Sequence, residues 1–215
     1  PQAIEPAIDA VTIDAISQSL TDSVRTSTGY LRIIDNNDLD GILPIGILDR
    51  PVELHIDGHL YWRGYITPAT YTAGWEVAPS EQAFPIQSAI TTLSDIVIPE
   101  QGEVFATIAG LLLELLSATG YTWQGVYIPI QMTGIDHQSV AVPELRMRVC
   151  RYNWLAASST DPEDADYSLL EGRTYMEMLQ DICQYFGWQA VEYADSIVML
   201  SNRYDVTNYI MLSMA

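Results

Sequence analysis

Residues 50–68 read RPVELHIDGHLYWRGYITP, and this pattern predicts a β-hairpin. Asp57-Gly58 stands between two runs of alternating apolar residues, and this dipeptide is typical of hairpin turns. Gly58 can adopt a positive φ angle without steric cost. We therefore expect an antiparallel sheet in the first half of the chain.

Two registers are open to this hairpin. A two-residue loop pairs Leu54 with Tyr61, which turns the apolar residues of the two strands to opposite faces. A three-residue loop pairs Leu54 with Leu60, so that the aliphatic residues share one face. We predict the three-residue loop. It buries Trp62 and places Gly64 where the strand bends or is closely approached.

The other face of the hairpin would then be polar and exposed to solvent. In this register His55 lies opposite His59, and the polar face consists of Glu53, His55, His59, Tyr61 and Arg63. Two imidazoles could begin a metal site, but zinc needs further ligands and none stands nearby. A solvated sheet face is the better interpretation.

The composition limits the kind of partner. The chain has 215 residues, of which 48% are hydrophobic, enough for one large domain or two small ones. The net charge is −19, from 28 acidic residues against nine arginines and no lysine. Such a surface repels nucleic acid and anionic lipid. The most apolar run, residues 104–116, is too short to cross a bilayer.

Two helices are predicted in the second half of the chain. Residues 103–119 are apolar on most sides, which is typical of a buried helix. Residues 174–186 form an amphipathic helix. In this helix Thr174 and Glu177 fit a capping box, and Gly187 stands where a C-terminal cap belongs.

Together these elements predict an α+β fold. Residues 1–98 are expected to form an antiparallel β-barrel-like domain, and residues 99–215 a smaller α+β domain. In the second domain the helix leads into a hairpin with strands at 189–193 and 197–200. The chain begins with Pro1 rather than Met, and we interpret it as a fragment of a longer protein.

Signals for catalysis are weak. The sequence has no Gly-rich phosphate loop and no Gly-x-Ser-x-Gly elbow. Cys183 lies on the apolar side of its helix, which favours a buried free thiol. Asp136-His137 is a lone pair, and the acidic run 161–166 contains Pro162 but no turn glycine for calcium. We expect no catalytic residue, no metal and no cofactor.

Three segments resemble structural proteins of phage and prophage tails. The first is the strand at 24–34 with the hairpin, whose residues 57–68 look like the strand pair of tail hub barrels. Residues 84–93, FPIQSAITTL, resemble the segment where these proteins leave the barrel and enter a short helix. Residues 174–200 are similar to the helix–hairpin unit of tail proteins from prophages of gut bacteria.

The resemblance to the baseplate hub or tail-tip family implies a non-enzymatic structural protein. It implies assembly as a ring-like homo-oligomer such as a trimer, in contact with tail-tube, tape-measure and tip proteins. The expected location is the virion tail, after assembly in the cytoplasm of the bacterial host. The site residues are then structural, namely Gly58, Trp62, Gly64, Thr174, Glu177 and Gly187.

Two other functions remain open at this point. A carbohydrate- or cell-surface-binding β module would use exposed aromatic residues, with Trp62, Tyr71 and Trp75 as candidates for the platform. Trp62 drops out if it is buried. A hydrolase would need two carboxylates at catalytic separation, and the sequence singles out no such pair.

Overall fold

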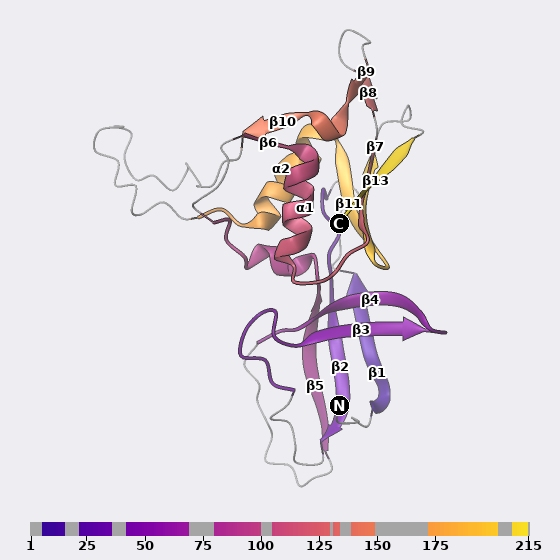
Figure 1. Cartoon of the computed structure of the whole chain (residues 1–215). Coiled ribbons are helices and arrows are strands. Elements are labelled where there is room, and N and C mark those ends of the chain that lie inside the picture. Colours follow the sequence, from indigo (N-terminus) through magenta and orange to yellow (C-terminus); the bar gives the residue numbers. More distant parts are fainter. Residues whose placement is uncertain are drawn as a thin grey trace, which may run out of the picture.

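A computed structural model describes residues 6–15, 22–35, 42–68, 80–99, 105–129, 131–133, 139–148, 172–201 and 208–214. These residues form two main sheets and two α-helices (Figure 1). The first sheet is antiparallel and curls into a half-barrel. The predicted α+β fold with a β-barrel-like domain is therefore confirmed.

The first sheet has five strands, in the order β1-β2-β5-β4-β3. Their bounds are Pro6–Ala15 for β1, Ser27–Asp35 for β2, Ser80–Ser88 for β5, His59–Ile66 for β4 and Pro51–Ile56 for β3. Alternating apolar residues give the sheet a core of its own, made of Ile33, Trp62, Ile66, Phe84 and Ile86.

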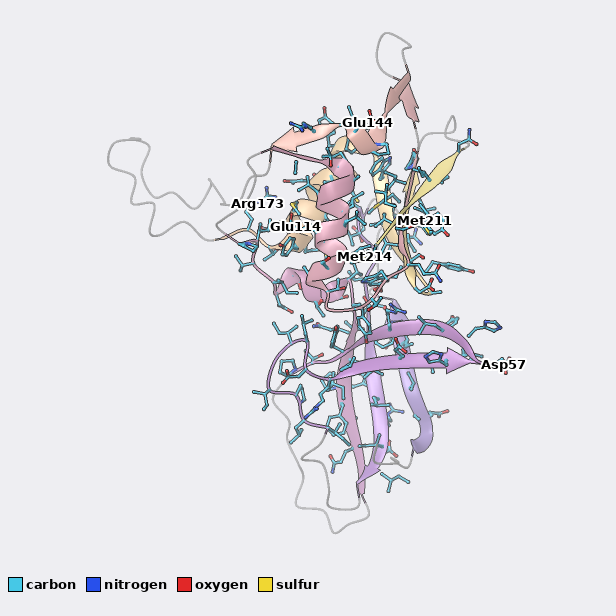
Figure 2. The ribbon with its side chains drawn as sticks, in the orientation of Figure 1. Asp57, Glu114, Glu144, Arg173, Met211 and Met214 are labelled. Carbon is cyan, nitrogen blue, oxygen red and sulfur yellow. The ribbon has the colours of Figure 1, made fainter. Side chains whose placement is uncertain are left out.

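The turn between β3 and β4 holds two residues, so the predicted three-residue loop is wrong. Ile56 pairs with His59, which leaves only Asp57 and Gly58 in the turn at the hairpin tip (Figure 2). Their φ angles are 52° and 80°. Two positive φ angles fit a type I′ turn, whose twist matches that of the flanking strands.

A β-bulge at Tyr61 restores the buried face of the hairpin. Past the bulge, Leu54 pairs with Trp62 rather than with Tyr61, because the extra residue shifts the alternation of β4 by one. Trp62 is buried, as predicted, and its indole N–H donates to Ser27 Oγ at 2.9 Å. The conflict that counted against a two-residue loop is thus removed by the bulge.

The prediction that the two histidines of the hairpin lie opposite each other is wrong. His55 pairs with Leu60 and His59 with Ile56. The His55 Nε2 atom lies 3.0 Å from the carboxylate of Glu53, on an exposed part of the sheet. Among the residues that the structure describes, no group of three His, Cys, Asp or Glu could hold a metal ion.

The second sheet has four strands, in the order β11-β12-β7-β13. Their bounds are Trp188–Tyr193, Ser196–Ser201, Gly125–Pro129 and Tyr209–Ser213. Helices α1 (Ile108–Ala118) and α2 (Tyr175–Phe186) cover one face of this sheet (Figure 1). The larger core lies between these helices and the sheet. It includes Leu111, Leu112, Leu115, Trp123, Val126, Ile128, Leu179, Ile182, Phe186 and Met199.

Short elements complete the described part of the chain. They are the 3₁₀ helices Thr91–Ser94 and Val142–Glu144 and the strands β6 (Phe105–Thr107), β8 (Gln131–Thr133), β9 (Ser139–Ala141) and β10 (Arg146–Arg148). Strand β6 shortens the first predicted helix. Residues 105–107 pair with β10, so α1 begins at Ile108 with Thr107 as its N-cap, rather than at 103.

The ends of α2 follow the sequence prediction. Thr174 Oγ1 accepts from the Glu177 N–H at 3.3 Å, and a Glu177 carboxylate oxygen accepts from the Thr174 N–H at 2.8 Å. This is the expected capping box, and Gly187 closes the helix with a φ angle of 67°. Cys183 is buried, as predicted, and burial raises the pKa of its thiol to about 12.

Thr174→Ala should lower the free energy of unfolding by about 1 kcal/mol, because the side-chain acceptor at the start of α2 is lost. Urea unfolding followed by circular dichroism would measure this change. Gln184→Ala, at an exposed position of the same helix, is the control and should change stability by less than about 0.5 kcal/mol. Equal effects of the two substitutions would contradict the role of the capping box.

The division at residues 98 and 99 stays a prediction. All strands of the first sheet lie between residues 6 and 88, while Ala89, Ile90, Leu93 and Ile98 pack in the larger core.

Several other predictions fall outside the described residues. These concern Tyr71, Trp75, Asp136, His137 and the acidic run 161–166.

Candidate functional site: the polar junction between the two sheets

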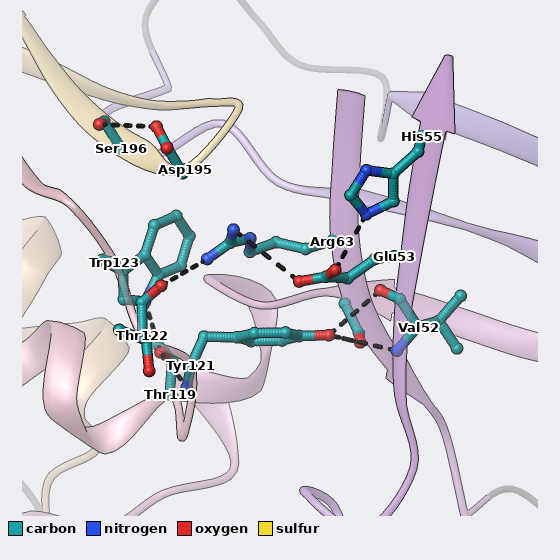
Figure 3. Close-up of polar contacts among 11 residues, drawn as sticks. Val52, Glu53, His55, Arg63, Thr119, Tyr121, Thr122, Trp123, Asp195 and Ser196 are labelled. Carbon is teal, nitrogen blue, oxygen red and sulfur yellow. Dashed lines mark hydrogen bonds and ion pairs between the residues drawn. The ribbon is translucent and has the colours of Figure 1, made fainter. Parts of the chain in front are cut away.

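Tyr121, just after α1, joins the second half of the fold to the first sheet. Its hydroxyl accepts from the Val52 N–H at 3.2 Å and lies 3.1 Å from the Val52 carbonyl oxygen (Figure 3). It also reaches the carbonyl oxygen of Gly64 on the neighbouring strand. One hydroxyl thus satisfies backbone groups of both β3 and β4, which need partners when they are removed from water.

Tyr65 makes a similar contact in the opposite direction. It is a buried residue of β4, and its hydroxyl donates to the carbonyl oxygen of Thr119 at 2.7 Å, at the C-terminal end of α1. The rings of Tyr65 and Tyr121 lie 4.9 Å apart. Burial raises the pKa of both phenols, so both remain hydrogen-bond donors at neutral pH.

Arg63 is buried, at 7% exposure, although the sequence predicted that it would face solvent. Its guanidinium carbon lies 5.1 Å from the ring centroid of Tyr121 and 5.0 Å from that of Trp123. Its Nη1 donates to the carbonyl oxygen of Thr122 at 3.0 Å, and its Nη2 is 3.9 Å from Glu53 (Figure 3). Residues 121–123 thus cover the polar face of β4.

Glu192, on β11, contributes the carboxyl group of this junction. It accepts from the backbone N–H of Ile90 at 3.0 Å and from the side chain of Ser88, at the end of β5. Burial raises its pKa to about 7. The two hydrogen bonds and the charge of Arg63 oppose that shift only partly.

The polar side chains of the junction connect the first half of the fold to the second, although Arg63 Nε is buried without a hydrogen-bond partner. Phenols, guanidinium and carboxyl are each paired with backbone groups or aromatic rings of the other half of the fold. The arrangement is therefore suited to holding the two sheets in a fixed relation. Cation–π contacts of a desolvated arginine contribute about 2 kcal/mol each.

The sequence analysis identified only residues that border this site. Among the predicted structural residues, Gly64 meets Tyr121 and Trp62 lies next to Arg63, while Gly58, Thr174, Glu177 and Gly187 serve the hairpin turn and α2. The sequence missed the roles of Arg63, Tyr65, Tyr121 and Glu192. The available signal in the sequence was the pair of aromatic residues Trp62 and Tyr65 close to the buried Gly64.

The outer face of the second sheet is a second surface of interest. Strand pairing places Val191, Val198, Tyr127 and Met211 in a row across all four strands, on the face opposite that of the core residues. Met211 is labelled in Figure 2. Tyr127 is 36% exposed and Met211 37%. No charged residue stands at the outward positions of these strands, which also include Tyr193, Leu200 and Tyr209.

Comparison with known proteins adds no relative. No protein-family model matches the chain, and no curated protein matches its sequence. Among the described residues, no helix is long and apolar enough to cross a membrane. The resemblance to tail proteins stays a prediction from the three segments quoted from the sequence.

Proposed function

We propose that the chain is a non-enzymatic structural protein of a phage tail, part of a baseplate hub or tail tip. The observation that carries this proposal is the uncharged apolar row on the outer face of the second sheet. It lies on a chain whose net charge is −19. Contiguous exposed apolar surface is typical of sites of protein–protein contact.

The junction supports the same proposal in a different way. A part that carries load between a tube and a tip needs domains that keep their relative position. The contacts of Tyr65, Tyr121 and Arg63 join the first sheet to residues 119–122, and Glu192 joins the second sheet to Ile90, just after the first sheet. These hydrogen-bonded pairs would have to separate before the two sheets could move apart.

The proposed partners are further copies of the chain, in a ring such as a trimer, together with tail-tube, tape-measure and tip proteins. The proposed location is the virion tail. Immunogold labelling of particles released by a host strain that encodes the chain tests both. Gold should collect at the tail end away from the capsid, and purified particles without label would contradict the proposal.

Met211→Asp tests the apolar row in solution. The wild-type chain should form a homo-oligomer by light scattering, and the variant should shift toward monomer at the same concentration. Burial of an unpaired carboxylate in an interface is strongly unfavourable. Tyr185→Asp is the matched control, because Tyr185 is 76% exposed on α2, away from the sheet face, and should leave the mass unchanged. A monomeric wild type, or equal masses for both variants, would count against assembly through this face.

The carbohydrate-binding alternative loses one of its residues. Trp62 is buried in the first sheet and cannot stack on a sugar. Tyr71 and Trp75 lie outside the described residues. We therefore retain the structural proposal.

A further inference from the structure

Strand β13 forms one edge of the second sheet (Figure 1). In the described part of the chain it pairs with β7 alone, so its other side has no neighbouring strand there. Such an edge presents unpaired backbone N–H and C=O groups, which are a template for a further strand. The edge is therefore a candidate for contact with another chain.

The ladder between β7 and β13 shows which backbone groups are turned outward. The Met214 N–H donates to the Gln124 carbonyl oxygen at 3.3 Å, so Met214 is turned toward β7. In an antiparallel ladder this inward bonding recurs at every second residue. Pro129, opposite Tyr209, has no N–H to donate, which fits the same alternation. The residues whose N–H and C=O groups point away from β7 are therefore Tyr209, Met211 and Ser213.

The sequence of β13 does not protect this edge. Natural edge strands usually carry charged residues, proline or a bulge that discourages pairing. Residues 208–214 read NYIMLSM, without charge or proline, and the ladder with β7 runs without a bulge. Ile210 is 40% exposed although it lies on the face of the buried Ile128. The helices thus leave room beside β13.

The other three edges of the two main sheets are protected within the described residues. Strand β1 contains a bulge, in which Asp9 has a φ angle of 57°. On β3 the Tyr121 hydroxyl already binds the backbone of Val52. Alongside β11, the Ala190 N–H donates to the Ser23 carbonyl oxygen at 2.8 Å. Of these edges, a second copy of the chain therefore has β13 open to pairing.

We propose that β13 pairs with β13 of a second copy, antiparallel about a two-fold axis at Met211. In this register Ser213 lies opposite Tyr209 of the second copy, so outward backbone groups meet outward backbone groups. Ile210 lies opposite Leu212 of the second copy, which brings together two apolar side chains. The contact goes beyond the proposed tail role and does not depend on it, because a two-fold contact closes by itself, whereas a ring needs two different surfaces.

Ser213→Pro tests the backbone pairing, because Ser213 lies on this edge but outside the apolar row. Its N–H is not used by β7, so proline should remove two hydrogen bonds per dimer and leave the ladder with β7 in place. Sedimentation of the whole chain should show a wild-type dimer whose dissociation constant rises at least about tenfold in the variant. Ser213→Ala keeps the N–H and is the matched control, with a change of less than about twofold.

Two outcomes of this experiment would overturn the edge pairing. One is a wild-type chain that stays monomeric at its highest soluble concentration. The other is an oligomer whose mass and dissociation constant are the same in Ser213→Pro and Ser213→Ala. The second outcome would assign assembly to another surface and leave the proposed function standing, and the labelling of particles tests the tail role separately.

Met211→Cys tests the register. In a hydrogen-bonded antiparallel pair the two Cα atoms lie about 5.5 Å apart, which is within disulfide range. Mild oxidation should therefore link most of this variant into a covalent dimer, above the background that the wild-type chain gives under the same conditions.

Val198→Cys separates edge pairing from contact through the sheet face. Val198 belongs to the same apolar row but lies on β12, two strands from the edge. Strands about 4.8 Å apart would keep the two copies of this residue about 24 Å apart in the edge dimer, so it should not link. Links at residue 198 with none at residue 211 would place the contact on the face and overturn the edge pairing.

Discussion

Gly64→Ala is expected to lower the free energy of unfolding by about 3 kcal/mol. A Cβ atom at this position would overlap the carbonyl oxygen of Gln87 and the ring of Trp62. Neither can move easily, because β4 pairs with β5 beside Gly64 and Trp62 is buried in the core of the first sheet. Chemical denaturation monitored by tryptophan fluorescence would measure the loss.

Gly46→Ala is the matched control. A Cβ atom at Gly46 would lie 3.6 Å from the carboxylate of Asp49, which is an ordinary contact distance. Its effect on stability should remain within about 0.5 kcal/mol. If Gly64→Ala were no more harmful than Gly46→Ala, the close approach of β4 and β5 at Gly64 would be refuted.

Local signals in the sequence predicted much of the fold. The capping box of α2 joins Thr174 to Glu177, three positions away, and Gly187 follows the helix directly. The burial of Trp62 follows from alternation within a single strand. In each case the interacting residues are close in sequence, so the pattern of residue types is sufficient.

The sequence could not predict the two departures from regular periodicity. The bulge at Tyr61 changes the register of the hairpin without leaving a distinctive residue pattern, since an exposed tyrosine fits any strand. Residues 105–107 continue the apolar pattern of α1 but are extended, because β10 pairs with them from some forty positions away. Tertiary pairing overrides helical periodicity there.

The junction could not be predicted because its members are far apart in sequence. Alternation correctly placed Arg63 on the polar face of β4, but a polar face is solvated only if nothing covers it. Tyr121 and Trp123 cover this one, and Glu192 approaches from a third segment. Only the three-dimensional arrangement shows that these residues meet.

Tyr121→Phe is expected to cost about 2 kcal/mol of stability, because the Val52 N–H loses its acceptor inside the junction. The ring would remain, 4.9 Å from that of Tyr65 and 5.1 Å from the Arg63 guanidinium carbon, so the loss reports on the hydroxyl alone. Thermal and chemical unfolding would measure it. Hydrogen exchange should also be faster at the Val52 amide than in the wild type.

Tyr61→Phe separates this effect from the general loss of a tyrosine hydroxyl. Tyr61 is 65% exposed, so its substitution should change stability by less than about 0.5 kcal/mol. The Met178 amide, which donates to the Thr174 carbonyl oxygen within α2, should exchange at the wild-type rate in both variants under conditions where exchange occurs by local opening. If Tyr121→Phe matched Tyr61→Phe in stability and in Val52 exchange, the hydroxyl would not connect the two sheets, and Arg63 and Tyr65 would have to hold them together.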